Sequence, residues 1–176
     1  MFNHCNIIWH KLTEKAIIPT KRLEDAGFDI YTTEDFVFLG PHQQHLFQTG
    51  LQVALDFNYW LAIWDRGSTG SRGIHVHCGV VDQGYRDELF ICLKNDNDYP
   101  IIFTAATDKV YFEDTAVVED KVYPKVMYYP VSKAIAQAIP MLQPIVTSQE
   151  VDTITWNDKF AHNSERGTGK LGSSGK

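Results

Sequence analysis

The segment GVVDQGYRDE, residues 79–88, carries side chains that can support hydrolysis at the end of a strand. The pair Gln83-Gly84 lies between two extended runs, which predicts a hairpin whose tip offers main-chain N–H and C=O groups to a flat ligand. Asp82 at the strand end can orient a water molecule as a general base, and Tyr85 can lay its ring against a sugar or base. An ordinary turn, with Tyr85 in the core, explains the same residues.

Two further segments have the composition of anion and cation sites. The loop DRGSTGSRG, residues 65–73, combines glycines with two arginines. Glycines let backbone N–H groups approach a phosphate, and arginine adds a charge-assisted fork. A plain surface loop is the alternative. In AGFDIYT, residues 26–32, Asp29 begins a strand, where its carboxylate can hold a hydrated Mg²⁺ or simply belong to a turn.

The histidines and cysteines do not predict a metal centre. His75, His77 and Cys78 look like a ligand triplet, but in a strand the two histidines share one face and the cysteine lies on the other. We expect ordinary strand residues there. The remaining cysteines are Cys5 and Cys92, and the absence of a C-x-x-C pair argues against a disulfide framework or structural zinc.

The elements that must position these residues are short and strand-like. Runs rich in β-branched and aromatic residues recur at intervals of roughly ten residues, separated by polar or glycine-bearing turns. They are FDIYT, DFVFLG, LQVALDF, WLAIWD, IHVHCGVV, ELFICLKN, PIIFT, KVYFED, KVMYYPV, IAQAIPML and TITW. The only helix that we expect is a short one near Ser148–Val151. The pattern predicts an all-β sandwich, jelly roll or barrel.

Composition bounds the class of protein. The chain has 176 residues, 44% of them hydrophobic, which fits one domain with a buried core. The formal net charge of −6 argues against a general nucleic-acid or anionic-membrane binder, while leaving room for a local basic pocket. The N-terminus lacks a signal-peptide core and no apolar run approaches membrane-spanning length, so a cytoplasmic location is expected.

The last twelve residues, ERGTGKLGSSGK (165–176), are rich in glycine and basic residues. They do not fit a P-loop, which needs G-x-x-x-x-G-K-[ST] between a strand and a helix. Glycine and serine tails of this kind are commonly disordered, and some are cloning remnants.

Taken together and in order, these segments resemble the five motifs of the trimeric dUTPase family, nucleotide hydrolases that cleave dUTP to dUMP and pyrophosphate. The family motifs A-G-x-D-[LI], R-S-[GS], G-[VI]-I-D-x-x-Y-R-G, G-D-R-I-A-Q and R-G-x-G-G-F-G-S-T-G correspond to residues 26–30, 66–68, 79–86, 135–137 and 166–175. The spaced Ala16 and Pro19 also resemble the opening strand of the family.

The resemblance implies a distorted jelly-roll or β-barrel domain over residues 1–164, followed by a mobile nucleotide-covering arm at 165–176. It implies a homotrimer with active sites at the subunit interfaces. Asp82 would activate the water that attacks the α-phosphate, Tyr85 would exclude a ribose 2′-hydroxyl, and Asp29 would hold waters of a Mg²⁺ ion. The other substrate-binding residues that it implies are Arg66, Gly67, Ser68, Gly79, Val81, Gln83, Gln137, Arg166, Lys170, Leu171, Gly172, Ser173 and Ser174.

The chain departs from the family pattern at several motif positions. Gly67 stands where a phosphate-contacting serine is usual, so Ser68 has to serve. Leu171 replaces the aromatic residue that stacks on uracil. The other departures are Asp87 for glycine, Ser132-Lys133 for Gly-Asp, Ala134 for arginine and Lys170 for glycine.

Residues 96–131 separate the third and fourth motifs by more than the family usually needs, and they read as extra strands. Phage-borne members of the family can carry such an insert, and a contact for a protein partner is one interpretation of this segment; a decorative hairpin arm is the other. Two alternative functions remain. One is a non-enzymatic regulatory protein on the same fold, and the other is a dCTP deaminase, for which Cys92 stands at the position of the expected glutamate.

Overall fold

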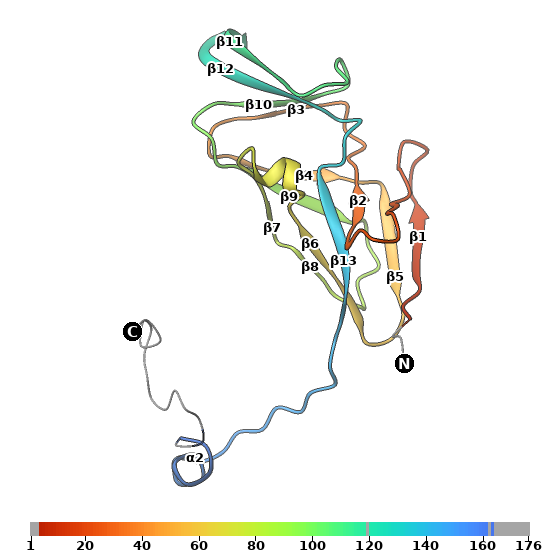
Figure 1. The fold of residues 1–176 in the computed structure, drawn as a ribbon, viewed down its shortest axis with the longest axis vertical. Helices are drawn as coiled ribbons and strands as arrows, with labels where there is room; N and C mark the ends of the chain where they lie inside the picture. The colour runs from red at the N-terminus through yellow and green to blue at the C-terminus, as the bar shows by residue number, and fades with distance from the viewer. Residues whose placement is uncertain (1–3, 119, 162, 164–176) are drawn as a thin grey trace. The chain divides into compact units, whose positions relative to one another are not determined.

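The computed structural model describes residues 4–118, 120–161 and 163, and the chain divides after Gln143 into two compact units. The first unit is built almost entirely of strands (Figure 1). The strands are β1 (Ile7–Lys11), β2 (Phe28–Ile30), β3 (Phe36–Leu39), β4 (Gln44–Gln48), β5 (Leu51–Leu55), β6 (Tyr59–Trp64), β7 (Ile74–His77), β8 (Val80–Val81), β9 (Phe90–Asn95), β10 (Ile101–Thr104), β11 (Tyr111–Val118), β12 (Lys121–Pro130) and β13 (Ala136–Leu142). One turn of helix, α1 (Gly67–Gly70), follows β6.

The strands form four sheets with the orders β1-β5, β11-β12-β10-β3, β2-β13-β6-β8 and β4-β9-β7. Strand β13 lies between β2 and β6, so the segment from the fourth motif is hydrogen-bonded to the segments that carry the first and second (Figure 1). The all-β prediction is confirmed, and the described strands form no closed barrel.

Alternating apolar residues close the core between the sheets. Phe47 packs edge-on against Phe103 with ring centroids 4.7 Å apart, and Phe103 lies 5.3 Å from Tyr129. All three side chains are buried. Such aromatic residues bury large apolar areas, and a buried tyrosine hydroxyl needs a hydrogen-bond partner inside the protein. Tyr129 therefore links the core to the polar region described below.

The extra strands predicted within residues 96–131 are present. Strands β11 and β12 pair antiparallel, and β12 joins β10 in parallel register (Figure 1). The Tyr111 and Tyr128 rings stack at 4.6 Å between these strands. A hydrogen bond with Glu113 raises the pKa of Tyr128 to about 12, with burial adding to the shift.

The run IHVHCGVV does not form one strand as predicted. It breaks at Cys78, whose φ of 59° is left-handed. Strand β7 pairs with β9, whereas β8 pairs with β6, so the chain changes sheets at this point. Strands β1 and β4 were not predicted, and no strand forms at residues 16–19, where the resemblance implied an opening strand.

The second unit begins at Pro144, and its described part contains helix α2 (Thr153–Lys159). The predictions of a strand at TITW and a helix at Ser148–Val151 are both wrong. Asp152 explains the outcome, because its carboxylate accepts a hydrogen bond from the Thr155 backbone N–H at 2.7 Å and caps the helix. This local cap outweighs the strand preference of the β-branched residues. No described helix has the length and apolarity needed to cross a membrane.

Candidate active site

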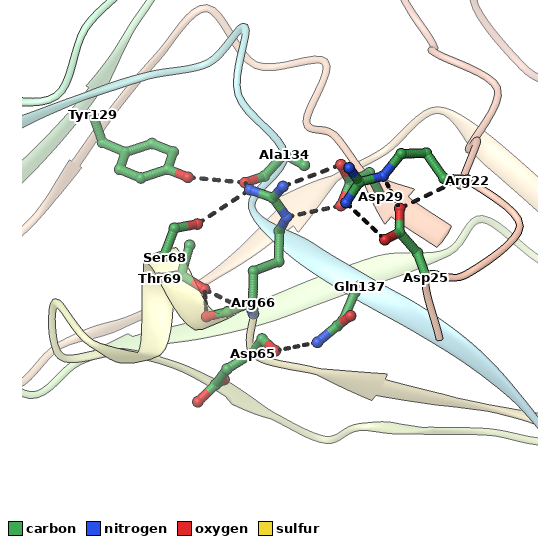
Figure 2. Close-up of polar contacts among 10 residues, drawn as sticks. All are labelled: Arg22, Asp25, Asp29, Asp65, Arg66, Ser68, Thr69, Tyr129, Ala134 and Gln137. Carbon is green, nitrogen blue, oxygen red and sulfur yellow. Dashed lines mark hydrogen bonds and ion pairs between the residues drawn. The ribbon is translucent and has the colours of Figure 1, made fainter. Parts of the chain in front are cut away.

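An ion pair between Arg66 and Asp29 forms the centre of the candidate site (Figure 2). Strand β2 carries Asp29, and Arg66 lies between β6 and α1. The guanidinium binds the carboxylate through two parallel bonds, Nε to Oδ1 at 2.8 Å and Nη2 to Oδ2 at 3.1 Å. A two-bond fork of this kind fixes the orientation of both groups. Both side chains are half-buried.

Gln137 brings the fourth-motif strand into the same cluster. It pairs with Asp29 across β13 and β2, and its Nε2 donates to the Asp65 carbonyl at 2.7 Å (Figure 2). A Cβ placed on Gly27 would lie 2.7 Å from Oε1 of Gln137. The glutamine of the fourth motif therefore occupies the space that a side chain at the first-motif glycine would need.

The other side of Arg66 faces α1 and the turn before β13. Its Nη1 donates to Ser68 Oγ at 3.2 Å and to the Ala134 carbonyl at 3.4 Å (Figure 2). Thr69 holds the backbone of Arg66, since its Oγ1 accepts from the Arg66 N–H at 3.0 Å. A Cβ on Gly67 would meet nothing within 4 Å. These contacts favour Ser68 as the hydroxyl that replaces the usual serine.

These residues line one cavity of about 780 Å³, which is called the phosphate side here because it gathers residues predicted from the sequence to contact phosphates. Its lining contains Asp29, Arg66, Gly67, Ser68 and Gln137 together with residues 20–22 and 24–27. Its charged groups balance: the cations are Lys21, Arg22 and Arg66, and the carboxylates are Glu24, Asp25 and Asp29.

The carboxylates of this cavity are largely engaged by arginine. Arg22 Nε and Nη2 each bind one oxygen of Asp25 at 2.9 Å (Figure 2). These hydrogen bonds lower the pKa of Asp25 and raise that of Arg22. Asp29 is engaged in the same way by Arg66. The Arg66 fork uses one lone-pair direction on each Asp29 oxygen and leaves the other open, so Asp29 can accept hydrogen bonds from the waters of a hydrated Mg²⁺.

Three of the residues predicted to bind deoxyuridine, Val81, Asp82 and Tyr85, line a different cavity of about 280 Å³, whereas Gln83 does not line it. A turn joins two of them, because the Tyr85 N–H donates to the Asp82 carbonyl at 3.0 Å. The Tyr85 hydroxyl donates to the Glu88 carbonyl at 2.6 Å, which fixes the ring. Partial burial raises the pKa of Tyr85, and the negative charges of Asp87 and Glu88 add to the effect.

The predicted hairpin is only partly correct. The turn forms, and Arg86 Nη1 braces it by donating to the Gln83 and Tyr85 carbonyls, both at 2.6 Å. The flanking strands β8 and β9 do not pair with each other, because they belong to different sheets. Gly79 precedes β8, and a Cβ there would lie 2.4 Å from the Ile63 carbonyl oxygen. Gly79 accordingly allows the close approach of β6 that holds β8 and the turn.

Within one chain the two groups of residues do not meet in one cavity. The phosphate-side residues line the larger cavity, while Val81, Asp82 and Tyr85 line the smaller one. Gly79 lines a third cavity with His75 and His77, where His75 Nδ1 lies 2.7 Å from Asp65 Oδ2. The predicted residues of the tail, Arg166, Lys170, Leu171, Gly172, Ser173 and Ser174, lie outside the described residues.

Several polar residues near the cluster were not among the predicted site residues. Arg22 and Asp25 precede the first motif, and Tyr129 donates from its hydroxyl to the Ala134 carbonyl at 2.9 Å. Arg72, in the predicted phosphate loop, donates to the Ser68 carbonyl. The clustering of both arginines of that loop with glycines was a usable signal for Arg72, whereas nothing in the local sequence of Tyr129 pointed to the site.

Comparison with known proteins identifies the family. The dUTPase family model matches residues 13–108, and the chain belongs to that family. A deoxyuridine 5′-triphosphate nucleotidohydrolase of Nautilia profundicola is 28% identical over 94% of this chain and 96% of its own length. The enzyme of that name from Mycobacterium marinum is 40% identical over 44% of this chain, which spans about half (53%) of that relative.

The fold is shared with phage dUTPases. The dUTPase of Staphylococcus bacteriophage 80alpha, solved as a G164S mutant with dUpNHpp, superposes with a TM-score of 0.71 at 22% identity, covering 97% of this chain and 99% of that one. The dUTPase of phage phi11 of S. aureus, solved to visualise a species-specific insert, gives a TM-score of 0.64 at 21% identity, with 84% and 96% covered. The fold is thus the jelly-roll type of the phage dUTPases.

Proposed function

We propose that this protein is a dUTP diphosphatase, which hydrolyses dUTP to dUMP and pyrophosphate. The observation that carries the proposal is the convergence of Asp29, Arg66, Ser68 and Gln137, from three separate parts of the chain, on one cavity. Arg66, Ser68 and Gln137 offer donors suited to phosphate oxygens, and Arg66 is held rigidly by Asp29. Membership of the dUTPase family supports the same substrate.

In the proposed reaction Asp82 accepts a proton from a water molecule, whose oxygen attacks the α-phosphorus. The bond between the α-phosphorus and the oxygen bridging to the β-phosphorus breaks, and the electron pair leaves with pyrophosphate. Main-chain groups of the Asp82–Tyr85 turn read uracil. The Tyr85 ring, fixed by its bond to the Glu88 carbonyl, leaves no room for a 2′-hydroxyl. Bound Mg²⁺ would supply charge neutralisation along the triphosphate, with Asp29 holding its waters.

A homotrimer with shared sites is part of the proposal. Since the two groups of residues line separate cavities within one chain, a complete site requires a second copy to bring its turn to the phosphate side. The tail residues Arg166, Lys170, Leu171, Gly172, Ser173 and Ser174 would then cover the nucleotide. Multi-angle light scattering at micromolar concentration tests the assembly, and a monomer there would contradict it.

The activity is tested by incubating the full chain with Mg²⁺ and each of dUTP, dCTP, dTTP and UTP, and measuring pyrophosphate and ammonia. We expect pyrophosphate from dUTP alone. Asp82→Asn keeps the shape and removes the proton acceptor, so its rate should fall by roughly 10²–10⁴-fold with little change in nucleotide affinity. An Asp82→Asn protein that turned over dUTP at the normal rate would show that another group is the base.

Two alternatives are measured by the same assay. Ammonia from dCTP would indicate a deaminase; burial raises the pKa of Cys92, leaving a neutral thiol where that activity needs a glutamate. Binding of dUTP without turnover would indicate a regulatory protein. A protein partner for residues 96–131 is compatible with dUTP hydrolysis and with a regulatory role alike. The exposed Val117 on β11 and Val122 on β12 favour such a partner.

A further inference from the structure

Two of the three cysteines lie side by side at the corner where the chain changes sheets. Cys92 is a buried residue of β9, the central strand of the order β4-β9-β7. Its antiparallel partner on β7 is His77, and Cys78 is the next residue. Paired Cα atoms lie about 5 Å apart and one residue adds about 3.4 Å along a strand, so the Cα atoms of Cys78 and Cys92 are separated by roughly 6 Å. This separation falls within the range of about 4.4–6.8 Å that a disulfide spans.

The backbone at Cys78 turns its side chain toward Cys92. Consecutive side chains of a regular strand point to opposite faces, so Cys78 would point away from the face shared by His77 and Cys92. Its φ of 59° is left-handed and breaks this alternation. The two thiols are in hydrogen-bonding contact; burial raises the pKa of Cys92, and the Cys78 thiol adds to the shift. The left-handed residue therefore brings together two sulfurs that a continuous strand would separate.

The two cysteines differ in their access to a small oxidant. The Cys78 side chain is exposed and lines the cavity of about 280 Å³ together with Asp82 and Tyr85. Cys92 is buried and does not line that cavity. A peroxide that enters the cavity meets Cys78 first, and Cys92 stands next to it. An exposed cysteine beside a second cysteine that can resolve its oxidised form is the arrangement found in redox-sensing thiols.

We propose that Cys78 and Cys92 are a redox modification site, at which hydrogen peroxide joins the two sulfurs in a disulfide. The Cys78 sulfur attacks one peroxide oxygen and the O–O bond breaks, which yields a sulfenic acid and one water. The Cys92 sulfur then attacks the Cys78 sulfur, the S–O bond breaks, and the leaving hydroxide takes up a proton to become a second water. The two thiols thus lose two electrons and two protons, and one peroxide molecule is reduced.

The bridge acts on the cavity that Asp82 and Tyr85 line. It closes a loop over residues 79–91, which contains β8 and the turn between these two residues. An S–S bond is about 2.0 Å long, well below the separation of two hydrogen-bonded thiols, so one cysteine must move. Cys92 is held between β4 and β7, and Cys78 at the exposed corner is the one that moves. The effect on a nucleotide rests on the proposed function, whereas formation of the bridge does not.

Peptide mapping of the full chain after treatment with hydrogen peroxide tests the bridge directly. Trypsin cleaves after Arg72, Arg86 and Lys94, so the bridge joins peptide 73–86 to peptide 87–94. We expect this linked pair in the oxidised protein and its loss after reduction with dithiothreitol. Failure to find the linked pair after peroxide treatment would overturn the proposal.

Cysteine variants identify the two sulfurs and their order of reaction. The matched control is Cys5→Ser, which removes the third cysteine and should form the same linked peptides. In Cys92→Ser the sulfenic acid at Cys78 has no resolving partner, so dimedone should trap it on peptide 73–86. A bridge that requires Cys5, or one that joins two chains, would overturn the proposal.

Calorimetry with the α,β-imido analogue of dUTP measures the consequence for the cavity. In Cys5→Ser, oxidation should weaken binding by at least roughly tenfold, since small displacements of a site are costly, and dithiothreitol should restore it. Cys78→Ser cannot form the bridge, so its affinity should be the same before and after peroxide. A bridged protein with unchanged affinity would overturn the link to the cavity. A protein that forms the bridge reversibly but, when reduced, does not cleave dUTP would refute the proposed function and leave the modification site supported.

Discussion

Three glycines at motif positions, Gly27, Gly67 and Gly79, provide a graded test of the site, because the space available to an added Cβ differs among them. At Gly67 it would meet nothing within 4 Å, at Gly27 the side-chain oxygen of Gln137 at 2.7 Å, and at Gly79 the main-chain oxygen of Ile63 at 2.4 Å. A flexible side chain can move aside, whereas a strand backbone cannot do so without disturbing its sheet.

The magnitudes follow from these contacts. Gly79→Ala should cost about 3–4 kcal/mol, combining overpacking with loss of the bond from the Ile63 N–H to the Gly79 carbonyl, which is 2.7 Å long in the protein. Gly27→Ala should cost about 1–2 kcal/mol, since Gln137 must turn and release the Asp65 carbonyl. Gly67→Ala should be neutral or stabilise the folded protein by up to about 1 kcal/mol, because alanine lowers the conformational entropy of the unfolded chain.

Urea unfolding followed by tryptophan fluorescence measures these differences, at one fixed protein concentration so that any association contributes equally. In a separate thermal unfolding experiment on a chain of this length, Gly79→Ala should lower the melting temperature by about 6–16 °C. A Gln137→Ala background should reduce the cost of Gly27→Ala, because the obstructing Oε1 is gone. If Gly79→Ala unfolded at the same urea concentration as Gly67→Ala, the explanation of the motif glycines by close approach would be refuted.

Three further outcomes are expected. Tyr85→Ala should let UTP compete with dUTP in a turnover assay, and an unchanged preference for deoxyribose would mean that another group senses the 2′ position. Arg66→Lys should weaken binding of the α,β-imido dUTP analogue by roughly tenfold in calorimetry, because an ammonium cannot form the two-bond fork; full affinity would show that the fork is dispensable. Deleting residues 165–176 should leave the folded state intact by circular dichroism and lower dUTP turnover by at least roughly tenfold. A truncated protein with full activity would show that the tail is not part of the site.

The sequence by itself determined the fold class and the family. Short β-branched and aromatic runs between turns predicted most of the strands, including the additional pair within 96–131, because alternation and turn residues are local signals. The ordered motifs identified Asp29, Ser68 and Gln137 as residues that meet around Arg66, although Ser132-Lys133 and Ala134 depart from the family pattern.

Local pattern failed where another part of the chain decided the outcome. The run through Cys78 was predicted as one strand, but its two halves pair with β9 and β6, which lie on different sheets. TITW has strand-forming residues, yet Asp152 caps it as a helix. Periodicity describes which face of an element is apolar, and it does not specify the partner of that element.

Only the tertiary structure explained why particular residues stand in the motifs and where charge is left uncompensated. Gly27 leaves room for Gln137, which lies 110 positions further along the chain and reaches it only because β13 pairs with β2. Two further cations lie beside Arg66. They are Arg72 and Lys133, and they likewise come from separate loops that meet only after folding. Coulomb interactions and steric contact depend on distance in space, so a sequence can supply the charges and the glycines, while the fold decides which of them act together.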